Sequence, residues 1–253
     1  MTQPVKLRNI QLGADRPKLA VPITGRSLTA LLRQLKPIVA EKPDLVEWRI
    51  DYFEDVTNPE KLVAAGQQIR QAIGEIALLT TFRTQGEGGA LLLPTEADYF
   101  KICQTVIDGG FTDALDVERY HDETAVKQAV VAAHAKKIII VMSNHDFQAT
   151  PSVTEIVKRL TGMAELGADV PKIAVMPQSV DDVLALLTAT NQARQKLTQP
   201  LITMSMGDLG KVSRVAGEVF GSCLSFATVG AGSAPGQVAL ERLRPMLQTL
   251  KLS

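Results

Sequence analysis

Short, almost continuously apolar runs alternate along the chain with longer segments of helical periodicity. Runs rich in Val, Ile and Leu are typical of parallel strands that are covered on both faces. The runs that fit this pattern are Lys18–Ile23, Asp44–Ile50, Ile76–Phe82, Asp113–Val117, Lys137–Ser143, Val170–Val175, Leu201–Met206 and Leu224–Thr228. The pattern predicts eight parallel strands.

Amphipathic segments lie between these runs. Leucines recur at helical spacing in Ser27–Ala40, and Ser152–Leu166 begins with a Pro-Ser capping signal. Val180–Thr190 and the apolar face between Val238 and Leu250 predict further helices. A helix after each strand favours an α/β fold of the (β/α)8 TIM-barrel type over an open sheet. Val5–Leu12 is interpreted as a short N-terminal β-hairpin.

Composition narrows the class of protein. The 253 residues include 27 Lys plus Arg and 27 Asp plus Glu, so the formal net charge is zero. A neutral chain predicts no sequence-independent grip on nucleic acid or on an anionic membrane. We find no linker or charge block, and expect residues 1–253 to form a single catalytic domain.

Cysteine use and the N-terminus indicate the compartment. Cys103 and Cys223 form no CxxC or Cys/His cluster, which argues against a disulfide framework and a structural zinc site. Met1–Ile10 has no long apolar core of the signal-peptide kind, and no stretch approaches the roughly 20 apolar residues of a membrane span. We therefore expect a soluble, cytoplasmic protein.

Lys172 stands inside an apolar strand. Strand alternation puts Lys172, Ala174 and Met176 on one face and Ile173 and Val175 on the other. If the Ile/Val face packs on outer helices, Lys172 points into the barrel. Partial desolvation would enlarge the share of neutral amine, the form that attacks a ketone to make an imine. A lysine whose ammonium simply reaches water is the alternative.

His145 lies just past the preceding strand, where a barrel places catalytic groups. A histidine close to an imine-forming lysine is suited to moving protons near neutral pH. A loop histidine bonded for structure is the alternative. His134 falls in a helical stretch and is expected on the surface, and His121 lies in a polar loop, so neither is a strong candidate.

Charged residues also recur at other strand ends. Glu47, Arg49 and Asp51 share one face of an otherwise apolar strand. If that face points inward, they must pair with one another or bind a ligand, and a face exposed on a sheet edge is the alternative. Arg83 can donate several hydrogen bonds to hydroxyl or carboxylate oxygens. Glu87 lies in a glycine-flanked loop that can approach another loop closely, or can form a mobile turn.

Two glycine-rich strand-to-helix loops occur late in the chain, at Met204–Arg214 and Gly230–Gln237. Taken alone, they fit phosphate cradles, mobile lids or ordinary tight connections. The sequence leaves these three interpretations open.

Together these segments resemble the type I 3-dehydroquinate dehydratase family. They follow the family's order from the second strand to the last loop, which is far more specific than any one motif. The matching segments are Glu47–Arg49, Thr81–Arg83 with Glu87, Ser143–Phe147, Pro171–Ala174, Met204–Gly207 with Arg214, and Gly232–Gln237.

The resemblance implies a role for each residue in eliminating water from 3-dehydroquinate to give 3-dehydroshikimate, a step of the shikimate pathway. Lys172 would form a Schiff base with the substrate ketone. His145 would move the protons, and Glu87 would orient His145. Arg214 would bind the carboxylate. The substrate hydroxyls would be held and covered by Glu47, Arg49, Arg83, Ser233 and Gln237.

The resemblance further implies a homodimer and chemistry that needs no metal or organic cofactor. It fails at Pro22, where some relatives have a serine, so we expect no side-chain hydrogen bond to substrate there. Two other functions stay open. One is another imine-forming barrel lyase, such as an aldolase, and the other is a non-catalytic barrel that binds a cyclic metabolite.

Overall fold

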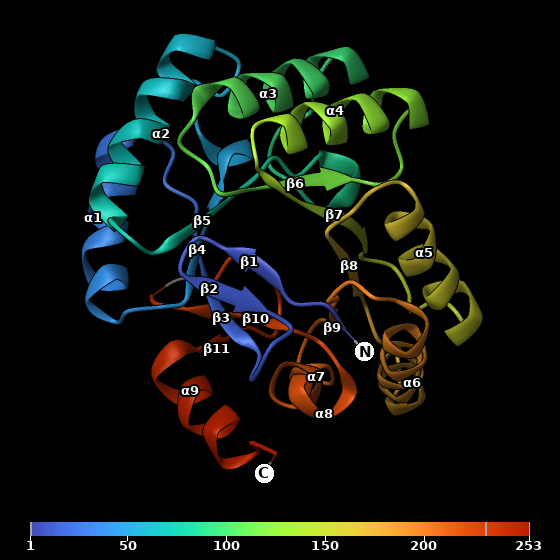
Figure 1. The fold of residues 1–253 in the computed structure, drawn as a ribbon. Coiled ribbons are helices and arrows are strands. Elements are labelled where there is room, and N and C mark those ends of the chain that lie inside the picture. Colours follow the sequence, from blue (N-terminus) through green and yellow to red (C-terminus); the bar gives the residue numbers. More distant parts are fainter. Residues whose placement is uncertain (1, 231, 253) are drawn as a thin grey trace.

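A barrel of parallel strands ringed by helices dominates the computed structural model, which describes residues 2–230 and 232–252 (Figure 1). The strands are β1 (Val5–Leu7), β2 (Ile10–Leu12), β3 (Lys18–Ile23), β4 (Leu45–Arg49), β5 (Ala77–Thr81), β6 (Ala114–Glu118), β7 (Ile139–Asp146), β8 (Val170–Val175), β9 (Ile202–Ser205), β10 (Leu224–Thr228) and β11 (Val238–Ala239).

Helices connect these strands on the outside of the barrel (Figure 1). They are α1 (Leu28–Ala40), α2 (Pro59–Ile73), α3 (Glu96–Gly109), α4 (Glu123–Ala135), α5 (Val153–Glu165), α6 (Val180–Lys196), α7 (Lys211–Val215), α8 (Gly217–Phe220) and α9 (Leu240–Thr249), with short 3-10 turns η1 (Ile50–Tyr52) and η2 (Gln85–Glu87). None of the described helices has both the length and the apolar character needed to cross a membrane.

The parallel strands form one curled sheet in the order β11-β10-β3-β4-β5-β6-β7-β8-β9. The sheet closes between β9 and β10, because Leu201 and Ser222, just before these two strands, form a parallel bridge. The backbone N–H of Cys223 donates to the Leu201 carbonyl at 2.8 Å, and the Ser222 hydroxyl accepts from the backbone N–H of Thr203. These bonds close the eight-stranded barrel, so the predicted fold is confirmed.

Three details differ from the sequence-based expectation. Strand β7 runs to Asp146, because its pairing with β8 continues through His145 opposite Ala174. His145 therefore belongs to the end of the strand and does not follow it. Two short helices, α7 and α8, follow β9, where the sequence predicted only a strand-to-helix loop, and β11 adds a brief pairing beside β10.

Two apolar cores lie on opposite faces of the barrel wall. The outer core packs the sheet against the helices and includes Ile173 and Val175 of β8. The inner core lies inside the barrel. The β1–β2 hairpin inserts Leu7 and Leu12 into it, each 1% exposed. The hairpin therefore closes the end of the barrel that faces the viewer in Figure 1.

Candidate active site

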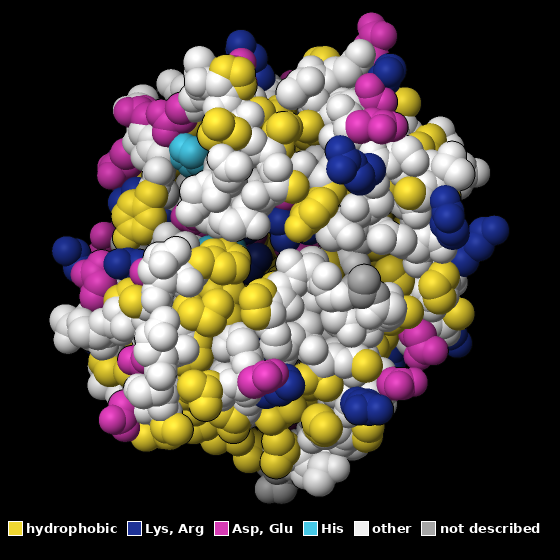
Figure 2. Space-filling view, turned by 180° about the vertical axis from the view of Figure 1, so that it is seen from behind, with side chains coloured by type: hydrophobic (Ala, Val, Ile, Leu, Met, Phe, Trp, Pro, Cys, Tyr) yellow, Lys and Arg dark blue, Asp and Glu magenta, His cyan; other side chains and the backbone are white. Residues whose placement is uncertain are grey.

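A cavity of about 270 Å³ opens at the other end of the barrel, where the strands have their C-terminal ends. Figure 2 views the molecule from behind and shows this face hollowed near its centre, with basic side chains inside. Eight of the predicted site residues line the cavity, namely Glu47, Arg49, Arg83, Glu87, His145, Lys172, Ser233 and Gln237.

Lys172 points from β8 into the cavity, as the strand alternation predicted. Its side chain is 3% exposed. The ammonium nitrogen Nζ donates to Oδ2 of Asp116 at 3.0 Å and lies 3.8 Å from Oε1 of Glu47. It also lies 4.8 Å from the centre of the Phe226 ring. Lys172 is thus held by two carboxylates and one aromatic face within reach of a small ligand.

Asp116 is the buried centre of the site, and sequence reasoning missed it. This β6 carboxylate accepts from Lys172, from Arg83 Nη2 at 2.8 Å and from the Ser143 hydroxyl at 2.6 Å. Burial raises the pKa of Asp116, but the Arg83 and Lys172 cations outweigh that effect and lower it below its ordinary value. The alternation of Asp116, Val117 and Glu118 is the signal that could have found it, as at Glu47 and Arg49.

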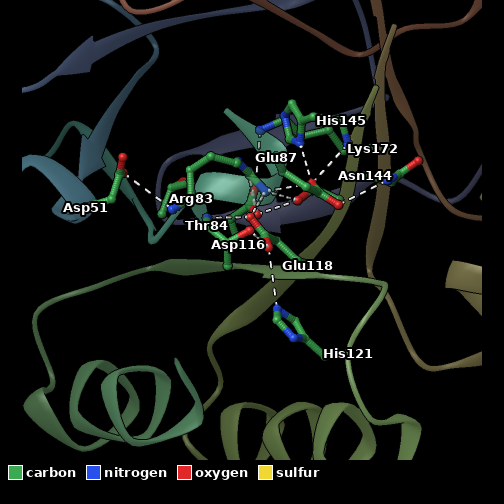
Figure 3. A network of polar contacts seen from close by, with 12 residues as sticks. Asp51, Arg83, Thr84, Glu87, Asp116, Glu118, His121, Asn144, His145 and Lys172 are labelled. Atoms are coloured by element: carbon green, nitrogen blue, oxygen red, sulfur yellow. Dashed lines mark hydrogen bonds and ion pairs between the residues drawn. The ribbon is translucent and has the colours of Figure 1, made fainter. Parts of the chain in front are cut away.

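His145, at the end of β7, and Glu87, in the loop between β5 and α3, form a hydrogen-bonded pair (Figure 3). Oε2 of Glu87 lies 2.9 Å from His145 Nδ1 and accepts the His145 backbone N–H at 2.9 Å. Asn144 Nδ2 donates to the other carboxylate oxygen at 3.0 Å. With Nδ1–H directed at the carboxylate, Nε2 is the ring nitrogen that can accept a proton.

The titration of this pair follows from its surroundings. Burial, reinforced by the Arg83 and Lys172 cations, holds the pKa of His145 well below its ordinary value. Burial also raises the pKa of Glu87, against the opposing effect of Arg83, to about 7. The lowered pKa of His145 and the raised pKa of Glu87 both favour a neutral His145 near pH 7, which is the form a general base needs.

The loop that carries Glu87 depends on glycine. Gly88 follows η2 with a φ of +83°, and a side chain there would overlap the Phe147 ring. The close approach brings the β5–α3 loop against the end of β7, where His145 lies. This confirms the expectation that the glycine-flanked loop can approach another loop closely.

Arg49, at the end of β4, and Arg83, just after β5, are both bound by carboxylates. Arg49 makes two 2.8 Å bonds to Asp51, which lies in η1 and accounts for the pairing expected of that charged face. Arg83 bonds Asp116 and Glu118 at 2.8 Å and Glu87 at 3.3 Å. Burial lowers the pKa of Arg83, but these carboxylates outweigh it and raise the pKa above its ordinary value.

Arg214 differs from those two arginines. It lies in α7, behind the lining of the cavity, and is 2% exposed. Nη2 donates to the Pro235 carbonyl at 2.9 Å and Nε has no hydrogen-bond partner. Within residues 2–230 and 232–252, no carboxylate lies within 4.0 Å of it. Burial lowers its pKa to about 10. A buried cation without an anionic partner is suited to receive one from a ligand.

Ser233 and Gln237 lie in the loop after β10 and bond to each other. Gln237 Oε1 accepts the Ser233 backbone N–H at 2.9 Å, and Nε2 donates to the Ser233 hydroxyl at 3.3 Å. Gly236, with a φ of +75°, packs on the backbone of Gly207, where any side chain would collide. The two glycine-rich loops are thus in contact above the cavity, next to Arg214.

Further polar residues that sequence reasoning missed support the site from behind. Ser143 donates to Asp116, Asn144 bonds Glu87, and Glu118 accepts from Arg83 and from Thr84. Among the residues that the structure describes, no group of three or more His, Cys, Asp or Glu side chains is arranged to hold a metal ion.

Comparisons with known proteins give a consistent result. Residues 19–253 match the family described as type I 3-dehydroquinase. The chain is 71% identical to the 3-dehydroquinate dehydratase of Lactiplantibacillus plantarum over 253 residues, all of both chains. A type I 3-dehydroquinate dehydratase structure from Clostridium difficile, with covalent modified comenic acid, is 41% identical over 98% of each chain, with a TM-score of 0.94. The structure of 3-dehydroquinate dehydratase from Geobacillus kaustophilus is 35% identical over 98% of this chain and 96% of its own, with a TM-score of 0.95.

Proposed function

The chain belongs to the type I 3-dehydroquinase family, and we propose that it eliminates water from 3-dehydroquinate, giving 3-dehydroshikimate, through an imine on Lys172. This reaction makes it a hydro-lyase. The observation that carries the residue assignment is the register of β7 and β8. Lys172 pairs with Ser143, and His145 pairs with Ala174. The nucleophile and the base therefore lie on adjacent strands, two residues apart in register, and both line the cavity.

The first step forms the imine. Lys172 loses one ammonium proton and attacks the ketone carbon as the neutral amine. That proton and one amine proton go to the carbonyl oxygen, which leaves as water, and a protonated C=N bond remains. Asp116 supports this step because its carboxylate, 3.0 Å from Nζ and held as the anion, stabilises the positive charge of the protonated imine. Burial of both groups keeps bulk water away from the new bond.

The second step is elimination. The protonated imine withdraws electrons and acidifies the adjacent carbon–hydrogen bond. His145 Nε2 takes that proton, and the same group then protonates the departing hydroxyl, which leaves as water. Glu87 stabilises the histidinium that forms between these events, because Nδ1–H points at its carboxylate. Hydrolysis of the imine then frees the product and the amine.

Substrate recognition is assigned to Arg214, which lies directly behind the cavity lining, and to the remaining cavity residues. Arg214 binds the carboxylate, since it is the buried cation for which the described residues provide no carboxylate. Glu47, Arg49 and Arg83 contribute polar atoms to the wall that faces the ring hydroxyls. Ser233 and Gln237 close over the substrate from the loop after β10. Pro22 offers no side-chain hydrogen bond.

The remaining expectations complete the proposal. Residues 1–253 act as one catalytic domain that works as a homodimer in the cytoplasm on a small-molecule substrate. No cofactor takes part, because Lys172 supplies the electron sink as an imine. Neither nucleic acid nor a membrane is a partner, in keeping with the net charge of zero.

Turnover of 3-dehydroquinate tests the proposed function directly. The product contains a conjugated carbonyl, so its formation is followed as a rise in ultraviolet absorbance. Purified protein should produce this signal, and borohydride added with substrate should stop it by reducing the imine. A protein that is folded but leaves 3-dehydroquinate unchanged would overturn the proposal.

A further inference from the structure

His121 lies outside the cavity but contacts the network that supports it. The side chain, in the loop between β6 and α4, is 13% exposed and stacks on the Tyr99 ring with centroids 4.2 Å apart. Nδ1 lies 2.7 Å from Oε1 of Glu96, and Nε2 lies 3.4 Å from Oε2 of Glu118. Figure 3 shows His121 on the far side of Glu118 from His145.

The two carboxylates hold the two ends of the loop that carries Glu87: Glu118, on β6, binds the start of the loop, and Glu96 stands at its end. Glu118 accepts the backbone N–H of Thr84 at 2.9 Å and its hydroxyl at 2.6 Å, which anchors the start of the loop. Glu96 is the first residue of α3, where the loop ends. Thr84 in turn accepts the backbone N–H of Glu87 at 3.0 Å. A single imidazole therefore spans the base of the loop.

We propose that His121 is a positioning residue that, in its protonated form, ties together both ends of the loop carrying Glu87. The proposal rests on the proposed function only in giving Glu87 its role beside His145. A neutral imidazole has one N–H, so one of its nitrogens would present a lone pair to a carboxylate oxygen. The histidinium carries an N–H on both nitrogens. Nδ1–H faces Glu96 at hydrogen-bond distance, and Nε2–H faces Glu118 as an ion pair at 3.4 Å that is not a hydrogen bond.

The surroundings of His121 favour this charge. Burial would lower the pKa of His121, but Glu118 of β6 and Glu96 of α3 outweigh it and raise the pKa above its ordinary value. Burial likewise raises the pKa of the Tyr99 hydroxyl on α3, so that this neighbour stays neutral. The side chain of Asp122, the N-cap of α4, accepts the Ala125 backbone N–H, and its own backbone N–H donates to the same Glu96 oxygen at 2.9 Å.

The bridge between Glu118 and Glu96 depends on the charge of His121 and therefore on pH. The bridge is fully present below the ordinary histidine range and is lost as pH rises through the raised pKa of His121. When the bridge is lost, Glu118 and Glu96, at the start of α3, each lose their contact with the His121 cation. The loop that carries Glu87 then becomes less ordered, and the hydrogen bond that orients His145 weakens.

Amide hydrogen exchange of residues 84–95 tests the bridge without substrate. Protection factors are measured at about pH 6 and about pH 9, either side of the histidine titration. We expect wild-type protection to fall about tenfold between them, the scale of one hydrogen bond to a charged group. In His121→Phe, which keeps an aromatic ring on Tyr99, protection should be low at both pH values.

Kinetics separate positioning from general stability. His121→Phe should lower kcat about tenfold at pH 7 with little change in KM, and its alkaline loss of kcat should disappear. His121→Lys, a cation that stays charged, should restore most of kcat. The matched control is His134→Phe, because His134 pairs with Asp169 at the end of α4, away from the loop. It should leave kcat and loop protection unchanged.

Glu96→Gln tests the same bridge if His121→Phe fails to fold. Glu96 is 44% exposed, and glutamine keeps its size. The pKa of His121, read by NMR, should fall in this variant, and the loss of loop protection should move to lower pH with it. Wild-type protection and pH profile in both variants would overturn the proposal. Wild-type turnover measured in the same series reports separately on the proposed function.

Discussion

The two ends of the barrel interior treat charge in opposite ways. At the hairpin end the interior is apolar, and charges pair at the rim, as Arg8 does with Asp113 at 3.2 Å and Lys18 does with Asp15 at 2.5 Å. At the other end, Lys172, Asp116 and Arg83 are all inside the wall and less than 5% exposed. The same strands carry stability at one end and chemistry at the other.

The difference also shows in what each end leaves unpaired. Every charge in the Lys172 network has a protein partner, whereas Arg214 has no carboxylate within 4.0 Å among the described residues. Burying a cation this way costs stability, which a purely structural layer would avoid. We infer that the cavity end gives up stability to receive an anionic substrate.

The largest expected effect on turnover comes from replacing Lys172, and Lys18 is the buried lysine at the hairpin end with which it is compared. Lys172→Ala should reduce kcat on the order of 10⁴-fold or more, the scale for removing a nucleophile. Lys18→Ala, at the hairpin end, is the matched control and should keep kcat within about twofold, with the loss appearing in stability. Steady-state kinetics and thermal unfolding of both variants make the comparison. Similar losses of kcat in the two variants would remove the distinction between the ends.

Arg214 tests the claim about the unpaired cation. Arg214→Ala should lower kcat/KM by roughly 2–5 kcal/mol of transition-state binding, about 30-fold or more. Its free energy of unfolding should stay level or rise, because no buried charge remains. Chemical denaturation and substrate-saturation curves give the two numbers. A near-normal kcat/KM would assign the carboxylate to another group.

Glu87 sets the expected acid limb of the pH profile. Its carboxylate form accepts Nδ1–H of His145, so activity should fall as pH drops through the raised pKa of Glu87, about 7. Glu87→Gln should lower kcat about 10- to 100-fold, as for other residues that orient a histidine. That variant should also lose the limb. Retention of an unchanged limb in Glu87→Gln would place the titrating group elsewhere.

The hairpin plug gives the smallest effect on turnover. Leu7 is 1% exposed within the inner core, so Leu7→Ala should cost about 2–5 kcal/mol in the free energy of unfolding. Because the cavity lies at the other end, kcat at low temperature should change less than about twofold in the variant that remains folded. Denaturant melts and initial rates check both. A large drop in kcat with intact folding would show that the two ends are coupled.

The sequence predicted the barrel well because burial on both faces makes each strand a continuous apolar run. Lys172 stood out as a charged residue inside such a run and His145 as a polar residue at the end of one, and the structure places both in one cavity. Asp116 was missed, although it is as buried as any core residue. Its signal, the alternation of Asp116, Val117 and Glu118, covers only three residues, which is too short for strand periodicity to stand out from chance.

Other features depended on contacts that sequence spacing does not show. His121 was taken for a polar loop residue, yet its partner Glu96 is 25 residues away. Arg214 was expected in contact with substrate, and the structure places it behind the cavity lining, bonded to Pro235 of the next loop. Such pairings arise only when the barrel closes and brings successive loops together.

The most direct test of the account is to trap the intermediate in a protein that lacks the base. His145→Ala, mixed with 3-dehydroquinate and borohydride, is analysed by mass spectrometry of the intact chain and of its peptides. Elimination should slow by about 100-fold or more. The account predicts a stable adduct on the peptide that contains Lys172. A folded variant with no adduct, or with the adduct on another lysine, would contradict the division of work between Lys172 and His145.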